Sequence, residues 1–305
     1  HKYEYCDLLI TGSGPSGLAS AYAAAKNGAR VILAEDKPRF GGSLLTSDVN
    51  IGNQTGVEWT EKIIAELKSM PNVTVKNRSQ VFGYYDHNML VMSERISDHL
   101  PKTQKYLPKQ RLWYIRANEV LISSGSIERP LVFGNNDTPG VMLSSAAKEY
   151  MKVYGVLVGK KPLIFTNNDS GYETAIEFKK NGVNPIILDT RSNPSSDIIT
   201  EAKNLNIEIK FSYVVVAAKG YKKVKSADIA KISDDKKELF NIENIECDCI
   251  CVSGFWTPSI HLASQSGNKS KFNEKIDAFI PDKSKQQENT IGSANGIFTL
   301  EETIK

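Results

Sequence analysis

The chain has 305 residues, of which 40% are hydrophobic, so it can bury a large core, and its length predicts two lobes rather than one. The formal net charge of +3 is small and the charges are interspersed, which argues against nucleic acid and anionic membrane surfaces as partners. Its apolar runs are shorter than the ~20 residues of a membrane span, and no signal peptide precedes the first predicted strand, so we expect a cytoplasmic protein.

The first 47 residues are typical of a strand, a glycine-rich turn, a helix and a second strand. Leu8–Ile10 predict a buried strand, Gly12, Gly14 and Gly17 form a G-x-G-x-x-G turn, and an alanine-rich helix leads to a parallel strand at Val31–Leu33. In such a turn the first glycine permits the bend, the second lets the backbone approach a pyrophosphate, and the third brings helix and strand together. We therefore predict a dinucleotide with its phosphates at the helix N-terminus.

Two features after this turn extend the predicted site. Glu35 ends the second strand about twenty residues past the turn, where a carboxylate takes both hydroxyls of an adenosine ribose. The pair Gly41-Gly42 then lets the following loop pass close to a bound dinucleotide. Both NAD and FAD present an adenosine diphosphate to such glycines, so these residues leave both cofactors open.

The rest of the first lobe completes a doubly wound sheet. We predict an amphipathic helix at 59–70, a third strand at 73–75 and an antiparallel hairpin of strands 81–85 and 89–92. Two further strands, 111–115 and 119–125, follow. The second of them ends at Gly125, where the chain can cross against a cofactor and enter the second lobe.

The second lobe repeats the pattern with a different turn. Helices are predicted at 144–154 and 172–181, and strands at 162–165 and 184–188. The turn between the first strand and the second helix has lost its glycines and carries Asp169, which we expect to cap the helix and to repel a phosphate. We therefore predict a dinucleotide fold without a dinucleotide.

Three of the four cysteines lie close together. Cys247, Cys249 and Cys251 alternate along a strand-like run, which predicts that all three share one face. A metal site is one reading, but the ligand spacing typical of zinc is missing, so we favour buried thiols and predict no metal. The chain also has no Cys-x-x-Cys redox pair, which argues against thiol–disulfide reduction.

The end of the chain returns to the first lobe. Residues 290–300 predict a strand end, a small-residue turn and a helix start, suited to the far side of a pyrophosphate. The first residue is not Met and the last helix is barely begun, so we expect a piece of a longer protein. The predicted fold is α/β, with two Rossmann-like lobes on parallel sheets: residues 1–134, an inserted lobe at 135–270, and a return at 271–305.

Four segments carry a narrower resemblance: Glu128–Met142, Thr166–Ser170, Ser253–Pro258 and His261–Ser266. They resemble the alpha subunit of heterotetrameric sarcosine oxidase, within the two-dinucleotide-fold flavoprotein superfamily. Two positions depart from these patterns. Phe255 stands where the family usually has a second glycine, and Ser293 where the superfamily usually has an aspartate.

The resemblance implies a function that composition and periodicity do not show. Sarcosine oxidase of this type oxidises sarcosine to glycine, produces hydrogen peroxide and passes a one-carbon unit to tetrahydrofolate. Its alpha subunit holds NAD in the glycine-rich site, FMN and FAD belong chiefly to the beta subunit or its interface, and gamma and delta subunits complete the assembly. No catalytic residue is implied in this region, so the isolated piece is expected to be inactive. The NAD contacts implied are Gly12, Gly14, Pro15, Ser16, Gly17, Glu35, Asp36, Lys37, Gly42, Ser43, Val81, Phe82, Ala294, Asn295 and Leu300, with Gly125 at the crossing.

Two other functions stay open. One is an FAD-dependent subunit of an amine, opine or proline dehydrogenase, or of another pyridine nucleotide-linked flavoprotein. The other is an interaction scaffold with a vestigial nucleotide site. The intact first turn and Glu35 argue against the scaffold, and the missing redox cysteines argue against an independent reductase.

Overall fold

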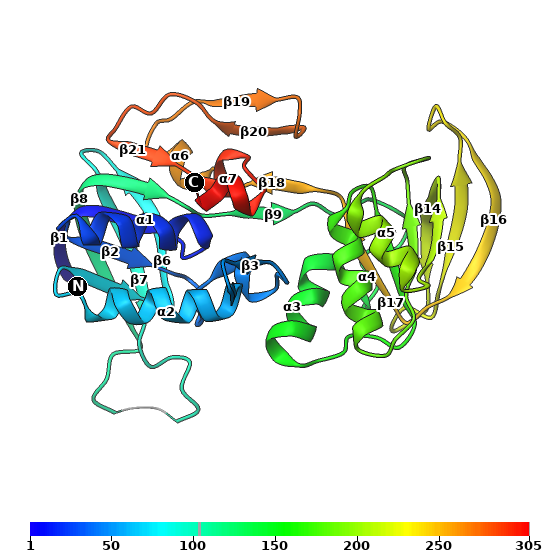
Figure 1. Cartoon of the computed structure of the whole chain (residues 1–305), viewed down its shortest axis with the longest axis horizontal. Coiled ribbons are helices and arrows are strands. Elements are labelled where there is room, and N and C mark those ends of the chain that lie inside the picture. Colours follow the sequence, from blue (N-terminus) through cyan, green and yellow to red (C-terminus); the bar gives the residue numbers. More distant parts are fainter. Residues whose placement is uncertain (103–104, 305) are drawn as a thin grey trace. The chain divides into compact units, whose positions relative to one another are not determined.

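The computed structural model describes residues 1–102 and 105–304, which divide into two compact units. The first comprises 1–127 and 257–305, and the second comprises 128–256, so the second unit is inserted in the first along the chain (Figure 1). Both are α/β units built on parallel strands, as predicted. The predicted lobe boundaries, at 134 and 270, fall further along the chain than these limits.

The central sheet of the first unit has the strand order β5-β2-β1-β8-β7-β6, with β21 also paired to β8. Strands β1, β2, β5, β8 and β21 are parallel, whereas β6 and β7 form the predicted antiparallel hairpin. Thr11 lies opposite both Ala34 and Ile122, and Thr290 lies opposite Ile122, so four carboxyl ends meet at one edge. The bounds are β1 Lys2–Thr11, β2 Val31–Ala34, β5 Val73–Lys76, β6 Ser79–Tyr85, β7 Met89–Arg95, β8 Gln110–Ile122 and β21 Glu288–Thr290.

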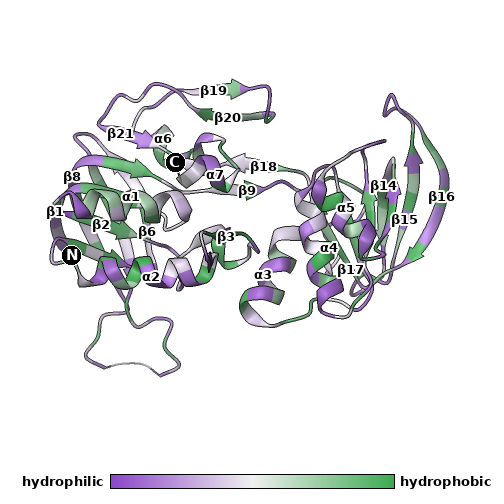
Figure 2. Cartoon of the chain, viewed as in Figure 1, coloured by the Kyte–Doolittle hydropathy of each residue, from purple (hydrophilic) through white to green (hydrophobic). Residues whose placement is uncertain are grey.

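Hydrophobic packing joins helices to one face of this sheet. Helix α1 (Pro15–Lys26) and helix α2 (Gly56–Ser69) pack on buried strand residues such as Ile10 and Leu33. A capping box between Thr55 and Glu58 starts α2, because each supplies an acceptor for the other's backbone amide. The colours of α2 alternate between hydrophilic and hydrophobic along its length (Figure 2), as expected for a half-buried helix.

The remaining elements of the first unit are short. They are η1 Gly42–Leu45, β3 Asn50–Ile51, β4 Gln54–Thr55, α6 His261–Gln265, β19 Ser270–Asn273, β20 Ala278–Pro281, η2 Gly292–Asn295 and α7 Leu300–Ile304. Strands β9 (Ser126–Glu128) and β18 (Trp256–Pro258) pair where the chain passes between the units.

One predicted pair of strands is a single strand. Residues 111–115 and 119–125 were expected as separate strands, but β8 runs from Gln110 to Ile122 without a break. Strand β1 pairs with it from Lys2 to Thr11, and this long partner keeps the intervening polar residues extended. The prediction of two strands was wrong because a polar stretch can be held in a sheet by its neighbour.

The second unit has a parallel sheet in the order β10-β17-β11-β12-β13. Helices α3, α4 and α5 cover one face, and the antiparallel sheet β14-β15-β16 covers the other. The bounds are β10 Val141–Leu143, α3 Ser144–Tyr154, β11 Pro162–Thr166, α4 Ser170–Lys180, β12 Ile186–Asp189, α5 Asp197–Asn204, β13 Glu208–Phe211, β14 Tyr213–Lys219, β15 Ser226–Ile232, β16 Leu239–Glu246 and β17 Cys249–Ser253. Within the described residues, none of the helices has the length and apolar character needed to cross a membrane.

Candidate dinucleotide-binding site

The glycine turn between β1 and α1 is tight at two of its three glycines. Gly12 has a φ of +102°, and a Cβ there would lie 2.2 Å from the carbonyl oxygen of Ser123. A Cβ at Gly17 would lie 2.1 Å from the carbonyl oxygen of Gly12. Any side chain at either position would therefore collide with backbone, which matches the structural tasks predicted for these two glycines.

Gly14 differs because it faces open space. A Cβ built there meets nothing within 4 Å, although Gly14 lies at the N-cap of α1. Among the residues that the structure describes, none caps this helix through a side chain. The first amides of α1 are therefore available to an anion, and the missing Cβ leaves room for it. This part of the site fits the pyrophosphate of a dinucleotide.

Glu35 follows β2 at the same edge of the sheet and is 6% exposed. Its Oε2 accepts hydrogen bonds from Ser13 N at 2.9 Å and from Ser13 Oγ at 2.5 Å, and its Oε1 accepts from Lys37 N at 3.0 Å. Burial raises the pKa of this carboxyl, and the neighbouring Asp36 carboxyl raises it further, whereas the bonds from Ser13 and Lys37 lower it. The acid thus lies beside the glycine turn, where a ribose is expected.

The loop after β2 approaches the glycine turn closely. A Cβ at Gly42, whose φ is +53°, would lie 2.9 Å from the Cα of Gly14. The amide of Gly41 donates to the carbonyl oxygen of Ser13 at 3.1 Å and is 3.2 Å from its Oγ. Ser43 is exposed in η1 directly after this contact. The structure therefore brings this loop beside the turn, as the Gly41-Gly42 pair predicts.

The closing segment of the chain also lies against the start of α1. A Cβ at Gly292 would be 2.5 Å from Ser16 Oγ, and one at Gly125 would be 3.9 Å from Ser293 Oγ. The amide of Ile291 donates to the carbonyl oxygen of Ile122 at 2.9 Å. The turn after β21 and the end of β8 thus meet at the glycine turn. Ala294 in this turn is fully buried, whereas Asn295 and Leu300 are partly exposed.

Four of the predicted cofactor contacts lie outside the segments that meet at the glycine turn. Asp36 and Lys37 are exposed beside Glu35. Val81 packs against the core of the other sheet face, and the carbonyl oxygen of Phe82 accepts from Gln265 Nε2 at 3.3 Å. The roles of all sixteen residues as cofactor contacts stay predictions.

Two serines near the turn, Ser13 and Ser123, were not predicted from the sequence. Ser13 is fully buried and joins Glu35 to the Gly41 loop, and Ser123 Oγ lies 3.1 Å from Ser16 Oγ. The G-x-G-x-x-G pattern treats the second position as free, so it carries no signal for Ser13. Ser123 is 107 residues from its partner, and only the parallel pairing of β1 with β8 brings them together.

The corresponding turn of the second unit is filled by its own side chains. Thr166 and Asn168 stand where Gly12 and Gly14 stand in the first unit, and Gly171 keeps the third place. A Cβ at Gly171 would lie 2.7 Å from Thr166 Cβ. Asn168 is 8% exposed, and its Oδ1 accepts from Ser170 N at 2.9 Å, at the position of an early helix amide. An internal acceptor therefore takes a donor that a phosphate would need.

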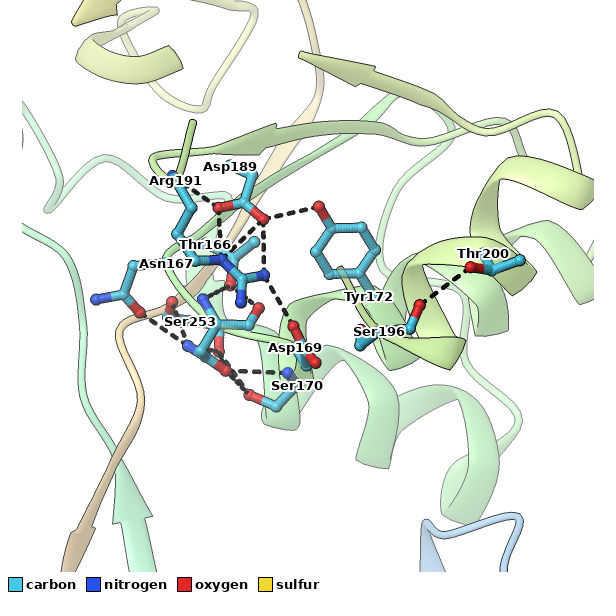
Figure 3. Close-up of polar contacts among 11 residues, drawn as sticks. Thr166, Asn167, Asp169, Ser170, Tyr172, Asp189, Arg191, Ser196, Thr200 and Ser253 are labelled. Carbon is cyan, nitrogen blue, oxygen red and sulfur yellow. Dashed lines mark hydrogen bonds and ion pairs between the residues drawn. The ribbon is translucent and has the colours of Figure 1, made fainter. Parts of the chain in front are cut away.

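Asp169 does not cap α4, and that expectation was wrong. It occupies the N-cap position without a side-chain cap bond, while Asn168 Oδ1 bonds the Ser170 amide instead. The carboxylate of Asp169 pairs with Arg191 Nη2 at 2.8 Å. Arg191 also binds Asp189 through Nε and Nη2, and Tyr172 donates to Asp189 at 2.7 Å (Figure 3). Asp189 ends β12 as Glu35 follows β2, but it is fully buried and engaged internally.

The three clustered cysteines do not share one face. Cys249 and Cys251 pack under the helices of the second unit, whereas Cys247 packs with Ile250 and Val252 on the opposite face. The chain bends at Asp248, whose carboxylate accepts backbone hydrogen bonds from residues 160 and 161, so β17 begins only at Cys249. All four cysteines are free and buried, as small core thiols.

The pyridine nucleotide-disulphide oxidoreductase family model matches residues 6–283. The chain belongs to this family. Its fold is that of FAD/NAD(P)-binding flavoprotein oxidoreductases. Two solved structures have a similar fold. Thioredoxin reductase from T. acidophilum has a TM-score of 0.74 at 16% identity, and the match covers 98% of this chain and 94% of that chain. L-proline dehydrogenase from P. horikoshii has a TM-score of 0.71 at 20% identity, and the match covers 99% of this chain and 53% of that chain.

Curated relatives confirm the narrower resemblance. The chain is 37% identical to the alpha subunit of sarcosine oxidase from Rhizobium meliloti (strain 1021) over 92% of this chain and 27% of that protein. It is 33% identical to the protein of the same name from Corynebacterium sp. (strain P-1) over 98% of this chain and 31% of that protein. An opine oxidase subunit from Agrobacterium tumefaciens (strain Ach5) is 26% identical over 53% of this chain and 33% of that protein. The chain spans less than a third of the length of the two sarcosine oxidase subunits.

Proposed function

We propose that the first unit binds NAD and that the chain is the NAD-binding central region of the alpha subunit of a heterotetrameric sarcosine oxidase. The observation that carries the first part is the open face of Gly14 at the uncapped start of α1, with buried Glu35 at the same sheet edge. The second part is supported by relatives of that name at 33 and 37% identity over nearly the whole chain.

In this proposal the chain binds NAD and orients it. The amides of Ser16 and Gly17 face the pyrophosphate, and Glu35 accepts from the adenosine ribose. The loop at Gly42 and the turn at Gly292 close the two sides of the glycine turn, because both already contact it. Bound NAD supplies a hydride acceptor, but this chain contributes no catalytic residue in the proposal.

The chemistry of the whole oxidase is assigned to its other parts. In this proposal the beta subunit holds FAD, with FMN there or at the interface, and oxidises sarcosine to glycine with production of hydrogen peroxide. The one-carbon unit passes to tetrahydrofolate, gamma and delta subunits complete the complex, and the assembly works in the cytoplasm. These steps rest on the resemblance to the alpha subunits of sarcosine oxidases.

The second unit is proposed to be structural and to contact the other subunits rather than a second dinucleotide. Asn168 and the Arg191 ion pairs take the groups that a phosphate and a ribose would require. The full-length alpha subunit should therefore co-purify with its beta partner as a stable complex. A full-length alpha chain that stays separate from the beta subunit on size-exclusion chromatography contradicts this role.

A second candidate is an FAD-bearing subunit of an amine, opine or proline dehydrogenase. It is supported by the match to the opine oxidase subunit over about half of the chain. The two candidates differ in the ligand of the first unit, since the glycines accept the adenosine diphosphate of either cofactor.

The absorption spectrum and calorimetric titration of the purified chain separate these functions. We expect a colourless protein that binds one NAD per chain. A yellow protein with a flavin spectrum favours the second candidate, and a chain that binds neither cofactor is the scaffold. Two nucleotides per chain would contradict the closed turn of the second unit.

A further inference from the structure

Ser13 is the most connected residue of the glycine turn. Its amide and hydroxyl both donate to Glu35 Oε2, at 2.9 and 2.5 Å, and its Oγ is 3.2 Å from the amide of Gly41. Its carbonyl oxygen accepts from the same amide at 3.1 Å. Ser13 is fully buried, so these contacts are shielded from water. One side chain thus links the turn, the acid after β2 and the adjacent loop.

These contacts divide the two oxygens of Glu35 between different partners. An ionised carboxylate has about four lone-pair positions, two on each oxygen. Ser13 uses two on Oε2, and Lys37 N uses one on Oε1 at 3.0 Å. The carboxyl of Asp36 also reaches this carboxylate, and its side chain is exposed to water, unlike the buried Ser13. The position left for a ligand is therefore on Oε1.

We propose that Ser13 is a positioning residue that holds Oε2 of Glu35 and leaves Oε1 as the acceptor for one ribose hydroxyl rather than two. This inference rests on the proposed nucleotide site of the first unit. It replaces the expectation that the carboxylate takes both hydroxyls, because Oε2 is already saturated by two donors from one residue. Ser13 acts on the ligand only through Glu35.

The ligand arm of the test uses ADP, the part that NAD and FAD share, with its 2′-deoxy and 3′-deoxy analogues. Calorimetric titration of the native chain should show that one analogue binds roughly tenfold more weakly than ADP, while the other binds within about twofold. In Ser13→Ala the difference in affinity between the two analogues should shrink, because Oε2 then keeps only the amide of residue 13 as a donor and can accept from a second hydroxyl. Equal losses for both analogues in the native chain overturn the inference.

The protein arm is a double-mutant cycle between Ser13→Ala and Glu35→Gln. Each single change should weaken ADP binding by roughly three- to tenfold, and the double variant should bind like Glu35→Gln alone. Ser16→Ala is the matched control, since its hydroxyl bonds Ser123 rather than Glu35 and its effect should add to that of Glu35→Gln. Additive effects of Ser13→Ala and Glu35→Gln overturn the inference. If circular dichroism shows that Ser13→Ala is unfolded, Ser13→Cys keeps the size and replaces it in the cycle.

The two proposals fail in different ways. If ADP binds the native chain and Glu35→Gln equally well, Glu35 is not at the ribose, and the proposed site fails with the inference. If Glu35→Gln weakens binding but Ser13→Ala acts additively with it, the site stands and the inference alone fails.

Discussion

The three glycines of the turn have separate mechanical tasks, and substitution can separate them. Gly14→Val should abolish nucleotide binding and leave the fold intact, because its side chain enters open space where the pyrophosphate is expected. Gly17→Val is the matched control and should unfold the first unit, since its Cβ would lie 2.1 Å from a carbonyl oxygen. Circular dichroism and calorimetric titration with NAD check both. A folded Gly14→Val protein with native affinity would place the pyrophosphate elsewhere.

Glu35 should decide between NAD and NADP. The 2′-phosphate of NADP would face this buried carboxylate, and exposed Lys37 only weakens the repulsion. A charge-assisted hydrogen bond is worth ~1.5–3 kcal/mol, so Glu35→Ala should lower NAD affinity by roughly ten- to a hundredfold and reduce the preference over NADP. Titration with both nucleotides measures this. Equal binding of NAD and NADP by the native chain would refute it.

The turn between β11 and α4 keeps the strand-turn-helix shape although side chains replace two of its glycines. Thr166 and Asn168 replace glycines, yet Gly171 keeps the close approach of helix and strand. The donors at the helix start bond to Asn168, and the acid at the end of β12 bonds to Arg191. Internal partners thus satisfy polar groups that would otherwise be left unpaired by burial.

Asp189 should matter much more than Asp169 to the stability of the second unit, although both pair with Arg191. Asp189 is fully buried and also accepts from Tyr172, whereas the Asp169 side chain is 44% exposed. Asp189→Asn should lower the free energy of opening by about 2 kcal/mol, discounted from the usual cost of breaking a buried pair because Arg191 is 31% exposed. Asp169→Asn should cost about 0.5 kcal/mol.

Hydrogen exchange of the β11 and β12 amides measures these costs within the second unit alone. Equal losses of protection in the two variants would mean that burial does not set the strength of these ion pairs.

For the molecule as a whole, the family name includes disulphide chemistry, whereas burial of the cysteines disfavours a reactive thiolate. All four are free and buried, and burial raises the pKa of the Cys6 and Cys247 thiols to about 12. The thiolates of Cys6 and Cys247 are thus scarce at neutral pH. We expect iodoacetamide at pH 8 to label none of the four in the folded chain and all four in urea, as counted by mass spectrometry. Rapid labelling of a cysteine in the folded protein would reopen a thiol role.

Much of the fold could be predicted from the sequence because its elements depend on local patterns. The apolar run before Gly12, the alanine-rich α1 and the apolar run at Val31–Leu33 each specify a short element through periodicity and turn chemistry. The bounds of α3 were predicted without error, since its apolar spacing is regular. The β6–β7 hairpin also followed from its alternation and intervening turn.

Neighbours along the chain specify the βαβ units, their glycine turns, the acid that follows β2 and the replacement of glycines in the second turn, so these features could be predicted from local patterns. The partners of the polar side chains follow from the folded chain instead: Ser13 bonds Glu35 across 22 residues, Ser16 bonds Ser123 across 107, and Asp169 pairs with Arg191 rather than with its own helix. It also joined two predicted strands into β8 and separated Cys247 from Cys249. The physical reason is that hydrogen bonds and packing choose among groups close in space, and the sheet register that brings those groups together is a property of the whole chain.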